Sequence, residues 1–136
     1  MKNQRILIIG ALVVLAVAAF FFSQKQTKVS DIKVGIILGF TGPIESLTPD
    51  MASGAELAFK EATDSGELLG GANIIPVRAD STCVDSAAAT TAAEGLVSQG
   101  IVAIMGADCS GVTGAVASNV AVPNGITIIS PSATSP

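Results

Sequence analysis

The feature that most limits how this chain can fold is an alternation, between residues 32 and 130, of short apolar runs with helix-forming segments. The runs are nearly continuous and rich in β-branched residues, which is typical of strands buried on both faces. We expect strands at 32–40, 73–79, 101–105 and 127–130. Strands that alternate with helices pair in parallel, so the pattern predicts an α/β domain with a doubly wound parallel sheet.

Three segments between the apolar runs predict helices, at 48–65, 85–99 and about 110–120. In the first, Thr48 is expected to be the N-cap, Pro49 to occupy the first helical position, and Gly66 to end the helix. Ser110 has the position of an N-cap for the third. Apolar residues at helical spacing predict the buried faces: Met51, Ala55, Ala58 and Ala62 in the first helix, and Ala88, Ala92 and Leu96 in the second.

The N-terminus has the pattern of an export signal. Lys2 and Arg5 precede an uncharged apolar run over residues 6–22, and the chain becomes polar again over residues 23–31. The run has 17 residues, which is long for a signal core and marginal for a spanning helix, since such a helix needs roughly 17–25 residues. We therefore expect residues 1–22 to be a signal peptide or a membrane anchor, and residues 23–31 to be a linker.

Export would place the two cysteines, Cys83 and Cys109, in an oxidising compartment. A disulfide between them is then the default expectation. Two unrelated buried thiols are the alternative that the sequence leaves open.

Composition argues against several classes of function. The chain has a net charge of −4 and contains no His, Trp or Tyr, so it lacks a basic, aromatic surface for nucleic acid. Without His, a serine such as Ser110 has no ordinary general base, and the commonest metal ligand is missing. The glycines at 66–71 and at 111–114 fit neither a phosphate-binding loop nor a dinucleotide fingerprint. We expect no enzyme, cofactor or metal site.

A ligand site is expected at the carboxyl ends of the strands, where open α/β sheets bind their ligands. The segments at that edge are rich in hydroxyl groups and glycine and carry no cation, which suits a small polar ligand. Ser110 can cap its helix or bind a carboxylate there. Ser132 and Thr134 either belong to a solvated turn or contact the ligand, and Asp80 and Asp108 are expected to be loop or capping acids. The segments are 41–47, 80–83, 107–111 and 131–135.

Several motifs, taken in order, resemble one known family. They are residues 32–35, 41–43, 54–58, 79–83, 104–110 and 129–136. Together they are similar to the N-terminal lobe of the periplasmic branched-chain amino-acid-binding proteins, the leucine/isoleucine/valine type, which have the type I periplasmic binding fold. The resemblance covers residues 32–136.

The resemblance implies a two-lobed receptor that closes on its ligand by a hinge motion and delivers it to the membrane permease of an ABC transporter. Ser110 and nearby backbone N–H groups would bind the ligand carboxylate, and Ser132 and Thr134 would bind other parts of the zwitterion. Leu47 takes the position of an aromatic ligand contact. Cys83 and Cys109 match the family's disulfide. Residues 32–136 would form part of the first lobe, and the chain is expected to be a fragment of a periplasmic protein.

Two questions of function stay open at this point. Relatives of the family bind amides, urea or aromatic acids, so the resemblance predicts a branched-chain amino acid or a related small amino acid or amide. The same fold also serves as the ligand-sensing domain of membrane-anchored signalling receptors, which an uncleaved segment 6–22 would favour.

Overall fold

A computed structural model describes residues 30–135 of the protein. The predicted signal or anchor, residues 1–22, and most of the predicted linker lie outside the described residues. Within residues 30–135, no helix combines the length and apolarity needed to cross a membrane. The elements, in chain order, are β1 (Ile32–Leu38), α2 (Thr48–Ser65), η1 (Leu68–Gly70), β2 (Ile74–Asp80), α3 (Ser86–Ser98), β3 (Ile101–Gly106), α4 (Ser110–Val116), η2 (Ala117–Ala121) and β4 (Thr127–Ile129).

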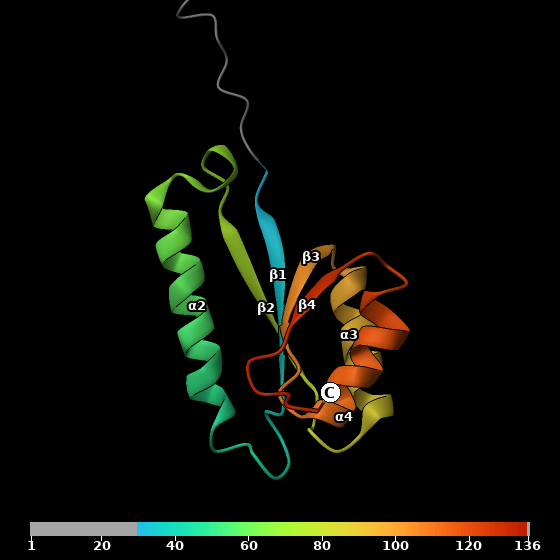
Figure 1. The fold of residues 1–136 in the computed structure, drawn as a ribbon. Coiled ribbons are helices and arrows are strands. Elements are labelled where there is room, and N and C mark those ends of the chain that lie inside the picture. Colours follow the sequence, from blue (N-terminus) through green and yellow to red (C-terminus); the bar gives the residue numbers. More distant parts are fainter. Residues whose placement is uncertain (1–29, 136) are drawn as a thin grey trace, which may run out of the picture.

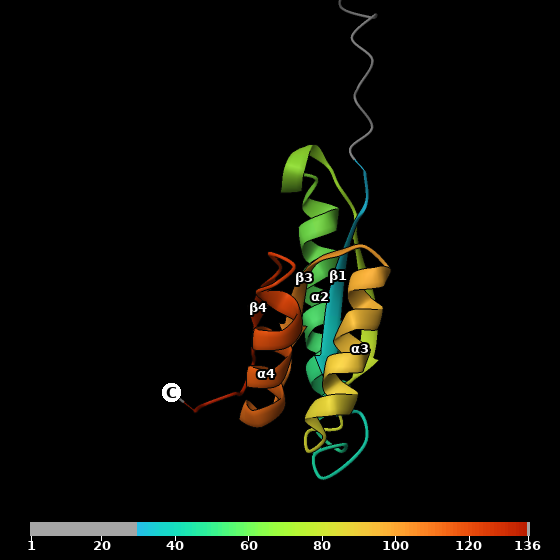
Figure 2. The same cartoon turned by 90° about the vertical axis from the view of Figure 1, so that its right-hand side faces the viewer.

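The strands form one parallel sheet in the order β2-β1-β3-β4. Helix α2 covers one face of this sheet, while α3 and α4 cover the other (Figure 1). Seen from the side, α3 and α4 lie next to each other over the sheet (Figure 2). The prediction of an α/β domain with a parallel sheet between helices is confirmed.

Strand β1 is apolar from Val34 to Leu38 because these residues are covered on both sides of the sheet. Ile37 packs into the core cluster beneath α3 and α4, whereas Ile36 and Leu38 pack into the cluster beneath α2. All three side chains are fully buried. Their alternation along one strand explains why the sequence shows a continuous apolar run there and no polar face.

The buried faces of the helices are rotated slightly from the prediction. Helix α2 buries Ala52 and packs Met51, Ala55 and Phe59 against the sheet, while the predicted Ala58 is exposed. In α3 the fully buried residues are Ala89, Ala93 and Leu96, whereas Ala88 and Ala92 are only partly buried. The predicted spacing is confirmed, and so are Met51, Ala55, Ala92 and Leu96 as core-facing residues. The exact face is wrong at Ala58 and Ala88, since alanine on an exposed face looks the same in sequence as alanine in the core.

Thr48 is not the N-cap of α2, which is a correction. The cap position is Leu47, and no side chain caps the helix. The Thr48 hydroxyl donates instead to the carbonyl of Gly39 at 3.0 Å, and Thr48 is fully buried. This contact ties the start of α2 back to the end of β1.

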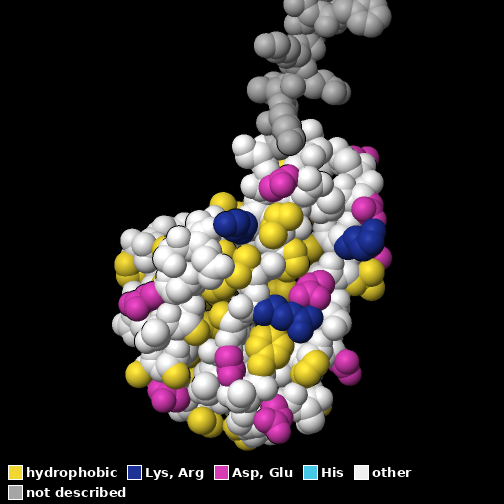
Figure 3. All heavy atoms as spheres, turned by 180° about the vertical axis from the view of Figure 1, so that it is seen from behind, with side chains coloured by type: hydrophobic (Ala, Val, Ile, Leu, Met, Phe, Trp, Pro, Cys, Tyr) yellow, Lys and Arg dark blue, Asp and Glu magenta, His cyan; other side chains and the backbone are white. Residues whose placement is uncertain are grey.

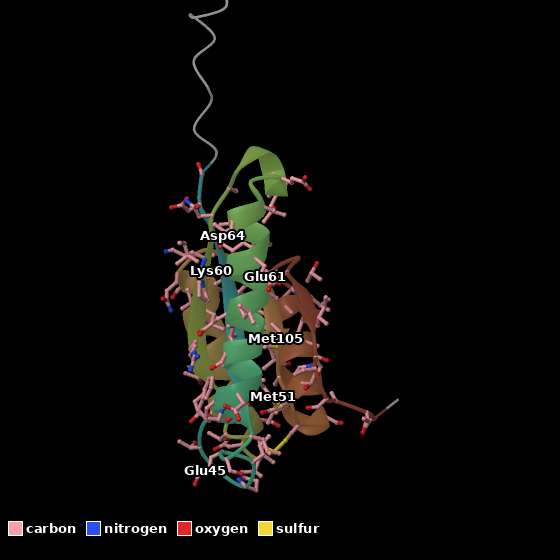
Figure 4. All side chains as sticks on the ribbon, turned by 90° about the vertical axis from the view of Figure 1, so that its left-hand side faces the viewer. Glu45, Met51, Lys60, Glu61, Asp64 and Met105 are labelled. Carbon is pink, nitrogen blue, oxygen red and sulfur yellow. A yellow bond between two sulfur atoms is a disulfide. The ribbon has the colours of Figure 1, made fainter. Side chains whose placement is uncertain are left out.

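Two ion pairs involve α2: one joins it to β2, and the other lies along its exposed face. Arg78 of β2 donates to both carboxylate oxygens of Glu56, at 2.6 and 2.8 Å, and its guanidinium lies 5.6 Å from the centre of the Phe40 ring. Lys60 and Asp64 pair one turn apart on the exposed face of α2, beside Glu61 (Figure 4). Lys33, Lys60 and Arg78 are the cations of residues 30–135, and all three lie on strands or on α2.

Candidate functional site

Four loops follow the carboxyl ends of the strands and lie at one edge of the sheet, the lower edge in Figure 1. We call them the edge loops: residues 39–47, 81–85, 107–109 and 130–135. They are bonded to one another as well as to the strands, because hydrogen bonds cross between them at several points. The edge on which the sequence placed the site is therefore a connected surface.

The predicted disulfide is present. Cys83 and Cys109 are bonded, with their Cα atoms 5.2 Å apart, and the bond is visible near the edge loops in Figure 4. It joins the loop after β2 to the loop after β3. Thr82 and Cys83 both have left-handed backbone angles, with φ of 57° and 69°, which is uncommon for residues other than glycine.

The loop after β1 packs closely on the loop after β2. Gly42 has φ of 96°, and a Cβ at this position would lie 2.6 Å from the carbonyl oxygen of Thr82. Only glycine allows this approach. Thr41, beside it, donates through its hydroxyl to Asp80 at 2.5 Å and through its N–H at 3.3 Å.

The hydrogen bonds at Asp80 change its acidity. Burial alone raises the pKa of Asp80, but hydrogen bonds from the Thr41 hydroxyl, the Thr82 N–H and the Thr41 N–H outweigh it. The pKa of this carboxyl therefore lies below its ordinary value of 3.8. Asp80 acts as the loop acid that the sequence predicted.

Asp108 lies at the centre of the edge. It is only 3% exposed, and its carboxylate accepts hydrogen bonds from the Gly39 N–H at 2.7 Å, the Cys109 N–H at 2.9 Å and the Ser81 hydroxyl at 3.3 Å. Sequence reasoning treated it as an ordinary loop or capping acid and missed its contacts with the loops after β1 and β2. The one available signal was a lone acid directly after an apolar strand.

Ser110 begins α4 but does not cap it, which corrects that part of the prediction. The cap position is Cys109, and no side chain caps α4. The Ser110 hydroxyl oxygen accepts the N–H groups of Thr134 and Ser135, at 3.1 and 3.2 Å. Its own proton stays available for a further acceptor.

Ser132 and Thr134 lie beside Ser110, so the structure brings these three predicted residues together. The Ser132 hydroxyl donates to the carbonyl of Asp108 at 2.8 Å, and Thr134 is held through its backbone. Both side chains are in exposed positions. Each residue is therefore held in place by a hydrogen bond, through the hydroxyl of Ser132 and the backbone N–H of Thr134, while it remains exposed to solvent.

Leu47 stands apart from this group. Its side chain is 60% exposed at the end of the loop after β1, and its backbone bonds are with Ile44 and Met51. Within residues 30–135, no hydrogen bond connects it to Ser110, Ser132 or Thr134. The structure thus gives Leu47 a place on the edge loops without bringing it into the hydroxyl cluster.

The chemistry of the edge loops is that of hydroxyls, backbone N–H groups and acids. They contain Glu45, Asp85 and Asp108, with Asp80 at the end of β2, and no Lys or Arg. Figure 3 shows acidic and apolar side chains, and no Lys or Arg, at the lower end of the face it draws. The described residues also hold no group of three or more potential metal ligands. Such a surface suits a neutral or zwitterionic molecule better than an anion.

Comparison with known proteins gives this surface a context. A family described as "Periplasmic binding protein" matches residues 31–136. The leucine-specific-binding protein of Salmonella typhimurium is 32% identical over the whole chain. The chain spans only 28–34% of the length of the curated relatives it matches.

Solved structures agree with the sequence matches. The substrate-binding protein LivJ of Streptococcus pneumoniae, crystallised with isoleucine, is 32% identical with a TM-score of 0.69, over 77% of this chain and 30% of that one. A solute-binding protein of Rhodopseudomonas palustris in complex with benzoate is 30% identical with a TM-score of 0.64, over 76% and 28%. These relatives are binding proteins. The chain belongs to the periplasmic binding protein family.

Proposed function

We propose that this protein is the extracytoplasmic solute-binding receptor of an ABC uptake system, and that it binds a branched-chain amino acid or a related small amino acid or amide. The observation that carries the proposal is the convergence of Ser110, Ser132 and Thr134 at the carboxyl edge of the sheet. Family membership adds the context, because a relative named for leucine binding matches the whole chain and a relative crystallised with isoleucine matches 77% of it.

The proposed roles follow from the donors and acceptors at the edge. The free proton of the Ser110 hydroxyl and the uncapped N–H groups at the start of α4 would bind a ligand carboxylate. Ser132 and Thr134 would offer hydroxyl or carbonyl oxygens to an ammonium or amide group. Leu47, which is exposed on the loop after β1 and apart from the hydroxyl cluster, would contact the ligand side chain.

The absence of cations from the edge loops supports a ligand without net charge. A carboxylate bound there is stabilised by hydrogen-bond donors alone, while hydroxyl and carbonyl oxygens of the same edge can accept hydrogen bonds from an ammonium group. An amino-acid zwitterion or a small amide meets both conditions. Benzoate, the ligand of one relative, carries a carboxylate and no ammonium.

The larger organisation is part of the same proposal. Residues 1–22 would act as a signal peptide or anchor, residues 23–31 as a linker, and residues 32–136 as part of the first of two lobes. The complete receptor would act in the periplasm and deliver its ligand to a membrane permease. Mass analysis of the exported protein tests the signal: a chain that begins after the apolar run is expected, and a chain that still begins at Met1 indicates an anchor.

Calorimetric titration of the full-length protein tests the binding role. The panel is L-leucine, L-isoleucine, L-valine, L-alanine, acetamide, urea and benzoate, each measured against the same protein batch. We expect saturable binding of at least one zwitterion or amide and weaker binding of benzoate. Absence of saturable binding across the panel would reject the proposed ligand class.

A second candidate is the ligand-sensing domain of a membrane-anchored signalling receptor. The apolar run at 6–22 favours it, because an uncleaved run of this length could hold the protein at the membrane. The sequence that follows residue 136 in the gene discriminates. A further membrane span with a signalling segment indicates a sensor, whereas a second lobe followed by a stop codon indicates a transport receptor.

A further inference from the structure

Asp108 is a buried acid that the proposed binding contacts do not use. It is 3% exposed, and within residues 30–135 it makes no ion pair. A buried carboxylate is costly unless hydrogen-bond donors surround it. Here the donors are two backbone N–H groups, of Gly39 and Cys109, and the hydroxyl of Ser81.

These donors come from different loops, so one residue connects the whole edge. Gly39 follows β1, Ser81 follows β2, and Asp108 itself follows β3. The fourth loop is included as well, because the Ser132 hydroxyl donates to the Asp108 carbonyl at 2.8 Å. Ser81 is fully buried, and its N–H donates to the Leu38 carbonyl at 2.8 Å, which locks the second loop onto β1.

The packing around the carboxylate leaves little freedom. A Cβ on Gly39 would lie 3.4 Å from Asp108 Oδ2 and 3.2 Å from the Cβ of Cys83. Two residues after Asp108 in the chain comes Ser110, whose hydroxyl holds the loop after β4 through two N–H groups. The position of Ser110 therefore depends on where the loop containing Asp108 is fixed.

We propose that Asp108 is the positioning residue of the ligand site. It does not touch the ligand; its buried carboxylate holds the loops after β1, β2 and β3 in register, its backbone carbonyl accepts the Ser132 hydroxyl of the fourth loop, and this register places the Ser110 hydroxyl for binding. The inference rests on the proposed function for its effect on affinity, while its effect on the loops is independent of any ligand.

The variant D108N tests this role with little change in shape. An amide has one acceptor oxygen in place of two, and its NH2 group must face either the Gly39 N–H or the Cys109 N–H. One backbone donor thus loses its acceptor in either orientation. The matched control is D85A: Asp85 lies on the same edge and accepts two backbone N–H groups, but both belong to the first turn of its own helix, α3.

The first measurement is hydrogen exchange of the ligand-free, full-length protein, followed by mass spectrometry. D108N is expected to speed exchange in peptides that carry Gly39, whose N–H donates to Asp108. It should also speed exchange in peptides that carry Thr134 and Ser135, whose N–H groups donate to Ser110 and not to Asp108. D85A should speed exchange only at the start of α3. Unchanged exchange at Thr134 and Ser135 in D108N would overturn the proposal. S81A, which removes one donor and keeps the charge bonded by two N–H groups, should change the same peptides less.

The second measurement is calorimetric affinity for L-leucine, L-isoleucine and L-valine. D108N should weaken binding about ten-fold or more, while D85A stays within about two-fold of wild type. If D108N binds as wild type does, the positioning role is wrong and the proposed function stands. If wild type binds none of the three while exchange changes as expected, these amino acids are wrong as ligands and the positioning role stands.

Discussion

Replacing both cysteines by serine should lower the free energy of unfolding by an amount that depends on the length of the loop closed by the disulfide. Cys83 and Cys109 are 26 residues apart. The loop that they close contains the last residues of the loop after β2, the whole of α3 and the whole of β3. In the chain-entropy account, the bond lowers the entropy of the unfolded chain by about 12 cal/mol/K for a loop of this length. At room temperature that is about 3.5 kcal/mol of stability lost in C83S/C109S.

Guanidinium unfolding of the full-length protein, followed by circular dichroism, measures the loss. The double variant should unfold at lower denaturant than wild type, and reductant should move wild type to the same midpoint. Reductant added to the double variant is the control and should change nothing. A double variant within about 1 kcal/mol of wild type would refute the entropic reasoning, since this is the range of an ordinary substitution.

Three further predictions concern the edge and the centre of the sheet. S110A should weaken ligand binding in calorimetry by about 1–3 kcal/mol, because part of the ligand carboxylate loses its donor; unchanged affinity would exclude a direct contact. G106A should lower the thermal midpoint severely, since its Cβ would lie 1.9 Å from the Ile37 carbonyl oxygen; a midpoint equal to wild type would contradict the close approach. The pKa of Asp80 is lowered in the folded state below its ordinary value of 3.8, so its contribution to stability is present above that value and is lost as pH falls through the lower folded pKa. Acid titration of stability should therefore be flatter in D80N than in wild type, and equal slopes would argue against this linkage.

The strands of the sheet could be predicted from the sequence because a strand buried on both faces is a nearly continuous run of apolar residues. Each β-branched run became a strand, with bounds shifted by at most two residues: β1 ends at Leu38 where the run continues to residue 40. The chain leaves the sheet there because the Gly39 N–H turns to Asp108 and its carbonyl accepts the Thr48 hydroxyl. Neither partner is near enough in sequence to show in a local pattern.

The same reason accounts for the two wrong caps. Thr48 and Ser110 have the residue type and the position of an N-cap, and local rules assign them that role. In the fold, each hydroxyl bonds a partner outside its own helix: the Gly39 carbonyl for Thr48, and the N–H groups of Thr134 and Ser135 for Ser110. Tertiary hydrogen bonds replaced the local ones, and only the topology reveals which residues meet.

The candidate site was predicted in its location and only partly in its construction. The rule that ligands bind beyond the carboxyl ends of parallel strands selected the edge loops before any contact was known. Ser110, Ser132 and Thr134 do meet there. The part played by Asp108 was missed because a lone acid after a strand carries no sign of three donors converging on it from separate loops.

The most direct test of the central claim is a crystal structure of the full-length protein with the tightest-binding member of the ligand panel. The account predicts a ligand carboxylate or amide oxygen within about 3.2 Å of the Ser110 hydroxyl, with Ser132 or Thr134 contacting the same molecule. A ligand bound away from the edge loops, or one held there without Ser110, would contradict it.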